Sequence, residues 1–167
     1  MAFTVVGLGS EVAGDDAIGL ILVAQVQGRL DDAPVTCVLW PEADALTVAH
    51  DLLALDAGVL LVDCADLGLE PGSARLLRST DVRLKVKDSP VSVHGIGLAE
   101  GLELAARLGF ARPVHLFAVQ PADLAPGTRL SEPLAARVPA LVTELEAAAR
   151  QLAGAGPGQD SDEGRTA

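Results

Sequence analysis

The sequence is poor in cysteine and in long apolar runs, and each shortage excludes a class of protein. Only two cysteines occur among 167 residues, Cys37 and Cys64, and they match neither a CxxC motif nor a zinc-site spacing. We therefore expect reduced thiols in a cytoplasmic protein, each a small hydrophobe in or beside a strand. Charges, glycines or prolines interrupt every apolar run before it approaches the roughly 20 residues of a membrane-spanning helix, so no such helix is expected.

Basic side chains are also scarce. The chain has 12 lysines and arginines against 23 acidic residues, for a net charge of −11. Such a surface repels nucleic acids and anionic membranes, so we predict neither as a partner, and a basic partner or a cation is easier to accommodate. Half of the residues are hydrophobic, which is enough to fill the core of one domain without disulfides or a structural metal.

The hydrophobic pattern predicts an α/β fold. Short runs of β-branched and large apolar residues alternate with amphipathic helical stretches, which is typical of a largely parallel sheet. We predict a three-layer sandwich, with helices on both faces of a twisted sheet of about five strands. The expected strands are 3–8, 35–40, 59–64 and 114–119, with a weaker edge strand at 73–79, and the expected helices are 16–30, 43–55, 97–108 and 132–153.

One domain and one tail are expected. Residues 1–153 carry all of the predicted strands and helices and form a single α/β domain. Residues 154–167, GAGPGQDSDEGRTA, are rich in glycine, proline and acids, so we predict a disordered acidic C-terminal tail. In a parallel sheet the loops that follow the strands meet at one edge, where ligands bind. That edge should collect loops 7–16, 40–44 and 63–72 and the chain from Gln120 onward.

The first of these loops is rich in glycine but matches no phosphate-binding motif. The dinucleotide fingerprint fails because Val12 stands where its third glycine belongs, and no Gly-Lys-Ser/Thr follows for a Walker A loop. Ser10 is not part of a GxSxG nucleophile elbow. The loop does place two carboxylates at the start of a predicted helix. We expect Asp15 to cap this helix and Asp16 to face the cleft at the sheet edge.

Two more residues belong to the same predicted edge. Asp63 ends an otherwise apolar strand, where a carboxylate is costly inside the sheet but natural beside a site. His94 lies just ahead of a predicted helix. For Asp63 the alternative to a site residue is an aspartate that starts a turn, and for His94 it is a histidine with a structural role. Together Asp16, Asp63 and His94 would give two carboxylates and one imidazole from three loops, which suits a divalent transition ion with open coordination positions.

Three motifs in order carry a family resemblance. GLGSEVAGDDAIG (7–19) resembles the GxGNxLxxDDGxG opening of hydrogenase maturation endopeptidases, and LLVDCADLGLEPG (60–72) resembles their second motif, an apolar run, an aspartate and a Pro-Gly turn. SVHGIGL (92–98) resembles their Ser-x-His-x-x-x-Leu. The stretch 118–142 is similar to their terminal segment of strand, Pro-containing loop, Leu-Ser-x-Pro and closing helix. The resemblance covers nearly everything before the tail.

The resemblance implies an endopeptidase-like domain over 1–153 and a specific reaction. Such a protease removes a C-terminal extension from the precursor of a nickel-iron hydrogenase large subunit after nickel insertion. The metal-contacting and catalytic positions of the family fall on Asp16, Asp63 and His94. The resemblance also implies that the cofactor is nickel carried by the substrate. An acid-rich cleft can bind other divalent ions adventitiously as well.

Two departures from the family pattern leave the identity of the substrate undetermined. Ser10 replaces the usual asparagine, and LWPEADALT (39–47) replaces the usual Asp-x-Gly-Thr-x-Gly after the second strand. The altered loop motivates an alternative, a non-catalytic, metal-dependent hydrogenase assembly or chaperone module on the same fold. A nucleotide-binding domain is disfavoured by Val12 and by acids where a phosphate would sit.

Overall fold

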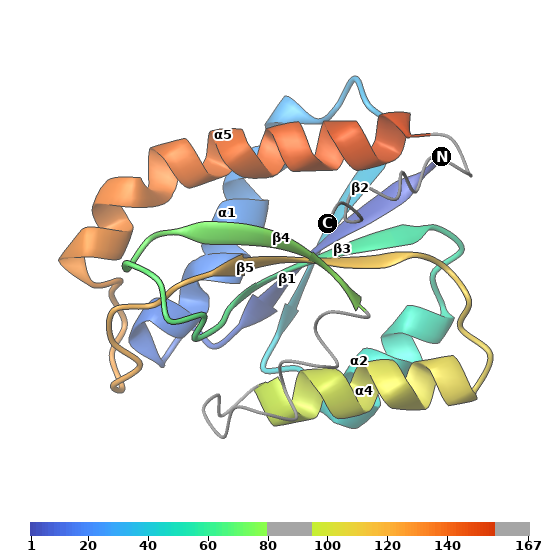
Figure 1. Cartoon of the computed structure of the whole chain (residues 1–167), viewed down its shortest axis with the longest axis horizontal. Helices are drawn as coiled ribbons and strands as arrows, with labels where there is room; N and C mark the ends of the chain where they lie inside the picture. Colours follow the sequence, from blue (N-terminus) through green and yellow to red (C-terminus); the bar gives the residue numbers. More distant parts are fainter. Residues whose placement is uncertain (80–94, 156–167) are drawn as a thin grey trace, which may run out of the picture.

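One five-stranded sheet forms the centre of the protein. The computed structural model describes residues 1–79 and 95–155. The strand order is β2-β1-β3-β5-β4, and every neighbouring pair is parallel except β4 with β5, which is antiparallel (Figure 1). The strands are β1 (Phe3–Gly9), β2 (Val35–Pro41), β3 (Gly58–Cys64), β4 (Ala74–Arg78) and β5 (Val114–Val119).

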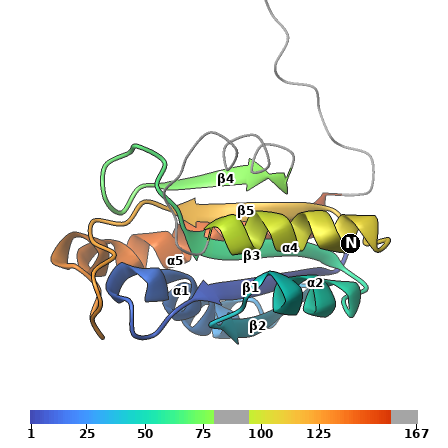
Figure 2. The same ribbon diagram turned by 90° about the horizontal axis from the view of Figure 1, so that it is seen from below.

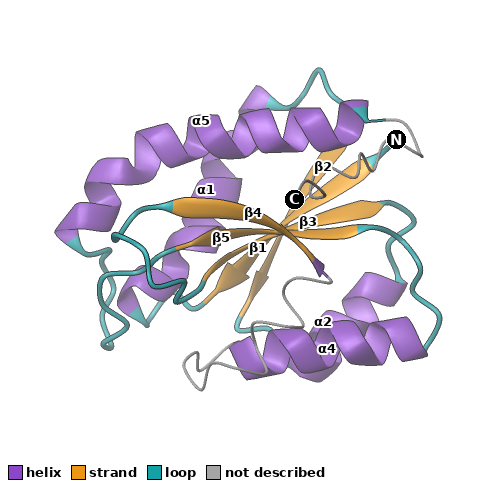
Figure 3. Ribbon diagram, viewed as in Figure 1, coloured by secondary structure: helices purple, strands orange, loops and turns teal. Residues whose placement is uncertain are grey.

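Helices cover both faces of this sheet. The described helices are α1 (Ile18–Val26), α2 (Ala45–Leu53), α4 (Gly95–Arg107) and α5 (Glu132–Gly154). α1 packs with α5 on one face, and α2 packs with α4 on the other (Figures 2 and 3). The predicted three-layer sandwich is confirmed. None of the helices in the described ranges combines the length and apolar character that crossing a membrane requires.

Alternating side chains of the central strands divide the core in two. Leu60 and Val62 of β3 belong to the cluster under α1 and α5, whereas Leu61 belongs to the cluster under α2 and α4. Every residue of β1 and β3 is buried. Because both faces of these strands are covered, their sequences read as continuous apolar runs rather than as alternating ones.

The predicted elements differ from the observed ones mainly at their ends. The helix expected over 16–30 is divided into α1 and two short 3₁₀ helices, Gly14–Ala17 before it and Gln27–Arg29 after it. The weak strand at 73–79 is present as the antiparallel edge strand β4. α5 includes Gly154, the first residue of the predicted tail, and residues 156–167 lie outside the described part. The tail and the one-domain division therefore remain predictions.

Loops from four strands meet at the carboxyl edge of the parallel sheet, as expected. The N–H of Glu42, after β2, donates to the carbonyl oxygen of Gly9 at 2.9 Å. The N–H of Gly127, after β5, donates to the carbonyl oxygen of Val12 at 3.0 Å. The side chain of Gln120 accepts N–H groups of the loop after β3. The first two bonds tie the first loop to the loops after β2 and β5, and the Gln120 bonds tie the loop after β3 to the end of β5.

Candidate metal centre

Asp63 occupies a buried position near the carboxyl end of the central strand β3. It is 4% exposed, and its carboxylate accepts the N–H of Cys64 at 2.8 Å. Burial, and next the negative charge of Asp16, raise the pKa of Asp63 to about 8, although the hydrogen bond from Cys64 lowers it. Asp63 also lines a small pocket whose other walls are mainly apolar, made by Leu8, Gly9, Ala43, Val48 and Leu98.

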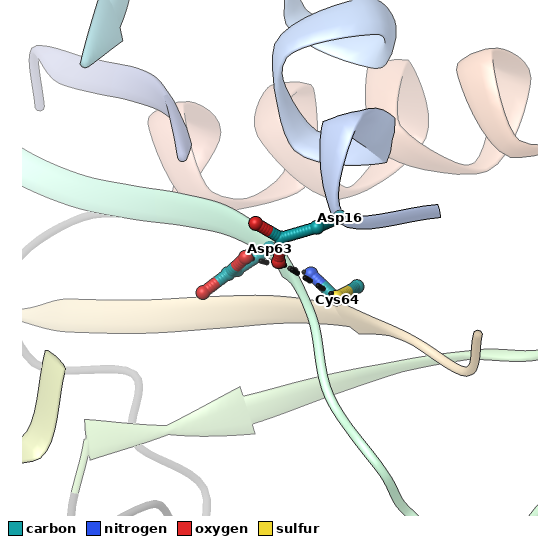
Figure 4. A group of neighbouring side chains, drawn as sticks. All are labelled: Asp16, Asp63 and Cys64. Atoms are coloured by element: carbon teal, nitrogen blue, oxygen red, sulfur yellow. Dashed lines mark hydrogen bonds between the residues drawn. The ribbon is translucent and has the colours of Figure 1, made fainter. Parts of the chain in front are cut away.

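Asp16 approaches Asp63 from the 3₁₀ turn ahead of α1. It is 3% exposed, and its Oδ1 accepts the thiol of Cys64 at 3.2 Å. Figure 4 shows the side chain of Asp16 reaching from this turn towards the end of β3, where Asp63 and Cys64 lie. One ligand atom from each of the three residues lies within 4.8 Å of the others. Two carboxylate oxygens and a sulfur at this spacing can hold a divalent ion.

Glycines in the first motif allow this close approach. Gly9 has a φ of +133°, and a Cβ built on it would lie 1.9 Å from the carbonyl oxygen of Asp16. A Cβ on Gly19 would lie 2.2 Å from the carbonyl oxygen of Val62 in β3. Any larger residue would push the start of α1 off the sheet and move Asp16 away from Asp63. The glycines of this loop therefore allow the close packing of the start of α1 against the sheet.

Asp15 does not cap the helix, so that expectation was wrong. The residue in the N-cap position of the 3₁₀ turn is Ala13, and no side chain caps the turn. The carboxylate of Asp15 instead accepts the backbone N–H groups of Ala122 at 2.8 Å, Asp123 at 2.9 Å and Ser131 at 2.7 Å, and the Ser131 hydroxyl at 2.8 Å. As a helix cap, Asp15 would accept fewer hydrogen bonds than the four that the segment between β5 and α5 donates to it. Asp15 therefore fixes the segment between β5 and α5 against the first loop.

These four hydrogen bonds also decide the charge state of Asp15. Burial raises the pKa of this carboxyl, but the hydrogen bonds from Asp123, Ser131 and Ala122 favour the charged form and outweigh burial, so the pKa lies below its usual value of 3.8. The two neighbouring aspartates thus play different parts. Asp15 is a structural anion, while Asp16 faces Asp63.

Two of the three predicted site residues are brought together. Asp16 and Asp63 share one buried group, whereas His94 lies outside the described residues, so its part in the site stays a prediction. Cys64 was expected only as a small hydrophobe. It does pack into the core under α1 and α5, but its sulfur also contacts Asp16. The burial of this thiol, and next the charges of Asp63 and Asp16, raise its pKa well above the usual value.

The sequence did not predict that Asp63 and Cys64 belong to the same group of possible metal ligands, because the two residues are neighbours in the chain. Successive residues of a strand point to opposite faces, so a shared group was not expected from neighbours. The carboxylate of Asp63 turns back to the N–H of Cys64, and Asp16 contacts the thiol at the strand end. The available signal was the position of Cys64 as the last residue of an apolar strand, directly after Asp63.

Smaller side chains order the loops around the site. The Ser10 hydroxyl accepts the N–H of Val12 at 3.3 Å, so serine provides a local hydrogen bond at the position where the family usually has asparagine. Asp66 accepts the N–H of Gly68 at 3.1 Å, a local hydrogen bond in the loop after β3. Gln120, which was not among the predicted site residues, accepts the N–H of Leu67 at 2.7 Å. It thereby links the loop after β3 to the end of β5.

The divergent loop after β2 contains a strained residue. Glu42 has a φ of +55°, in the left-handed region where a Cβ crowds the backbone at a cost of about 1 kcal/mol. We expect Glu42→Gly to raise the free energy of unfolding by about 1 kcal/mol, because it relieves this crowding and keeps the N–H bond to Gly9. Urea denaturation measures the change. Glu42→Ala removes the same charge but keeps the Cβ, so equal gains in both variants would contradict the conformational explanation.

Comparisons with known proteins agree on one family. The family profile described as hydrogenase maturation protease matches residues 44–148. The hydrogenase expression/formation protein HoxM of Cupriavidus necator is 29% identical over 119 residues, which cover 71% of this chain and 58% of HoxM. The chain thus spans less than two thirds of that relative.

Solved structures share the fold. An endopeptidase from Escherichia coli superposes with a TM-score of 0.75 at 23% identity, over 91% of this chain and 94% of that one. The NiFe hydrogenase maturation protease HybD of Thermococcus kodakarensis superposes with a TM-score of 0.69 at 20% identity, over 89% and 99%. At these identities the likeness establishes the architecture alone.

Proposed function

Because this chain belongs to the hydrogenase maturation protease family, we propose that it is an endopeptidase acting on a nickel-iron hydrogenase large-subunit precursor. The proposed reaction removes a C-terminal extension after nickel has been inserted. The observation that carries this proposal is the meeting of two buried carboxyl groups, Asp16 and Asp63, at the carboxyl edge of the sheet. Burying two such groups in their charged forms is unfavourable, so one of them keeps a proton until a cation joins them.

In the proposed reaction the nickel belongs to the substrate. Asp16 and Asp63, with His94 as the third predicted ligand, would hold the nickel of the precursor and thereby position the peptide bond to be cut. A metal at this point polarises a carbonyl group or lowers the pKa of a bound water. Asp63, whose pKa of about 8 keeps its carboxyl group largely protonated near neutrality, would give up its proton as the metal binds.

The setting of the reaction is part of the proposal. The partner is the hydrogenase large-subunit precursor, and neither nucleic acid nor a membrane takes part, which the net charge of −11 supports. We place the reaction in the cytoplasm, where thiols stay reduced. The two cysteines of the chain are both free, as such a compartment would leave them.

Nickel dependence of cleavage tests this function. We expect the purified protein to shorten the nickel-loaded precursor by one discrete C-terminal peptide and to leave the nickel-free precursor intact, because the metal is the proposed recognition element. The mass of the precursor is followed over time, and His94→Ala should abolish the change. A metal-dependent complex with an uncut precursor would instead support the non-catalytic assembly module. Cleavage at equal rates with and without nickel would refute the proposed role of the metal.

A further inference from the structure

Cys64 is a buried thiol that the proposed mechanism does not yet use. We propose that its sulfur is a third protein donor to the metal held by Asp16 and Asp63. The inference rests on the proposed function only for the origin of the metal, the nickel of the precursor. The donor set itself follows from the positions of the three side chains.

The geometry favours coordination over simple packing. Cys64 is 7% exposed, and its Sγ lies 3.2 Å from Oδ1 of Asp16, within a group whose ligand atoms lie within 4.8 Å of one another. A cysteine that only fills space is satisfied by apolar neighbours. Here the sulfur is directed at a carboxylate, and the backbone of the same residue is held by the carboxylate of Asp63 at 2.8 Å.

The pocket that Asp63 lines supplies a second observation. Asp63, which is more than nine-tenths buried, lines it together with apolar residues from β1, α2 and α4. A buried carboxyl group that borders a pocket is costly in an empty site and favourable when a cation enters. Asp63 therefore connects the pocket to the group that it forms with Asp16 and Cys64, whose ligand atoms lie within 4.8 Å of one another.

A thiolate donor changes which metals bind. When the ion binds, the S–H bond breaks, a sulfur–metal bond forms, and the proton leaves to water through its present acceptor, Oδ1 of Asp16. Thiolate favours nickel, cobalt, zinc and cadmium, whereas carboxylates alone would also suit magnesium and manganese. Cys64 would therefore bias the site towards the softer divalent ions.

A cobalt titration tests the assignment directly. Adding Co²⁺ to the purified, metal-free protein should produce the near-ultraviolet charge-transfer absorption that only a sulfur–cobalt bond gives. We expect Cys64→Ser to lose this band and to bind Co²⁺ about 10- to 100-fold more weakly, since a direct donor contributes at least as much as an outer partner. Cys37→Ser is the matched control, because Cys37 lies on β2 outside the group, and it should keep the band.

The outcomes separate this inference from the proposed function. A parent protein that binds Co²⁺ without the band, or a Cys64→Ser variant that keeps it, would overturn the assignment of Cys64. Urea denaturation of Cys64→Ser and Cys64→Ala shows whether each variant is folded, and a folded Cys64→Ala without the band supports the inference. Precursor processing is measured separately, so an inactive protein with the band would refute only the endopeptidase.

Discussion

Replacing Asp63 with asparagine should abolish precursor processing and also stabilise the metal-free protein. Asparagine keeps the shape of the side chain and an oxygen that can accept the N–H of Cys64. It lacks the charge that would bind nickel, so cleavage should fall below detection in the mass assay. It also removes the cost of a carboxyl group that is buried beside Asp16. Opposite effects on activity and stability are typical of a functional site.

The stability gain should depend on pH in a defined direction. The folded pKa of Asp63, about 8, lies above its ordinary value of 3.8, so the folded protein retains a proton that the unfolded chain releases. The parent therefore loses stability as the pH rises from about 4 to about 8. Asp63→Asn should match the parent below about pH 4 and exceed it by about 2 kcal/mol or more at about pH 8. Urea denaturation with a chelator present measures this difference.

A nearby aspartate provides the control. Asp66 follows on the same loop but is exposed, and Asp66→Asn keeps the acceptor for the N–H of Gly68. This variant should process the precursor at the parental rate and show the parental pH dependence of stability. If Asp63→Asn is instead less stable than the parent at pH 8, the buried carboxyl group of Asp63 does not destabilise the folded protein. If it still cleaves the precursor, Asp63 is not a metal ligand.

The fold was predictable because its signals are local or follow from layer packing. The central strands β1 and β3 are covered on both faces, so Phe3–Gly9 and Gly58–Cys64 read as unbroken apolar runs. The edge strand β4 carries Arg75 and Arg78, as an exposed margin requires. The expected ends of helices were less accurate. Asp44 caps α2 by accepting the N–H of Thr47, so the helix begins at Ala45, two residues after the predicted start at residue 43.

The candidate site was predictable in part, for a similar reason. Polar residues at the carboxyl ends of parallel strands share one edge, which was enough to place Asp16 and Asp63 together. The partners of Asp15 could not be foreseen, because they lie 107 to 116 residues away in the chain. Cys64 was missed because successive residues of a strand point to opposite faces, and the contacts of its N–H with the Asp63 side chain and of its thiol with Asp16 are not visible in the sequence.

The second large effect on stability is expected at Asp15, because its carboxylate stabilises the folded protein whereas that of Asp63 destabilises it. We expect Asp15→Asn to lower the free energy of unfolding by about 3 kcal/mol near pH 7. The carboxylate of Asp15 accepts four hydrogen bonds, three of them from backbone N–H groups between β5 and α5. Asparagine has one acceptor oxygen, and its amide would face donors, so buried N–H groups would lose their partners.

The pH dependence of this loss is the reverse of that for Asp63. The folded pKa of Asp15 lies below its ordinary value of 3.8, so its contribution to stability is full above that value and disappears as the pH falls through the folded pKa. The difference in the free energy of unfolding between Asp15→Asn and the parent should therefore become smaller only in strong acid. The corresponding difference for Asp63→Asn should grow towards alkaline pH. One set of urea titrations across pH separates the two residues.

Asp123→Asn is the matched control for this prediction. Asp123 lies on the loop that Asp15 holds, is exposed, and accepts the N–H of Ala125 at 2.8 Å, a bond that asparagine can keep. Its stability should stay close to that of the parent. A comparably small effect of Asp15→Asn would mean that the loop holds its position without the carboxylate. A large loss confined to Asp15→Asn would identify this buried anion as the clamp that keeps the first loop, and with it Asp16, in place beside Asp63.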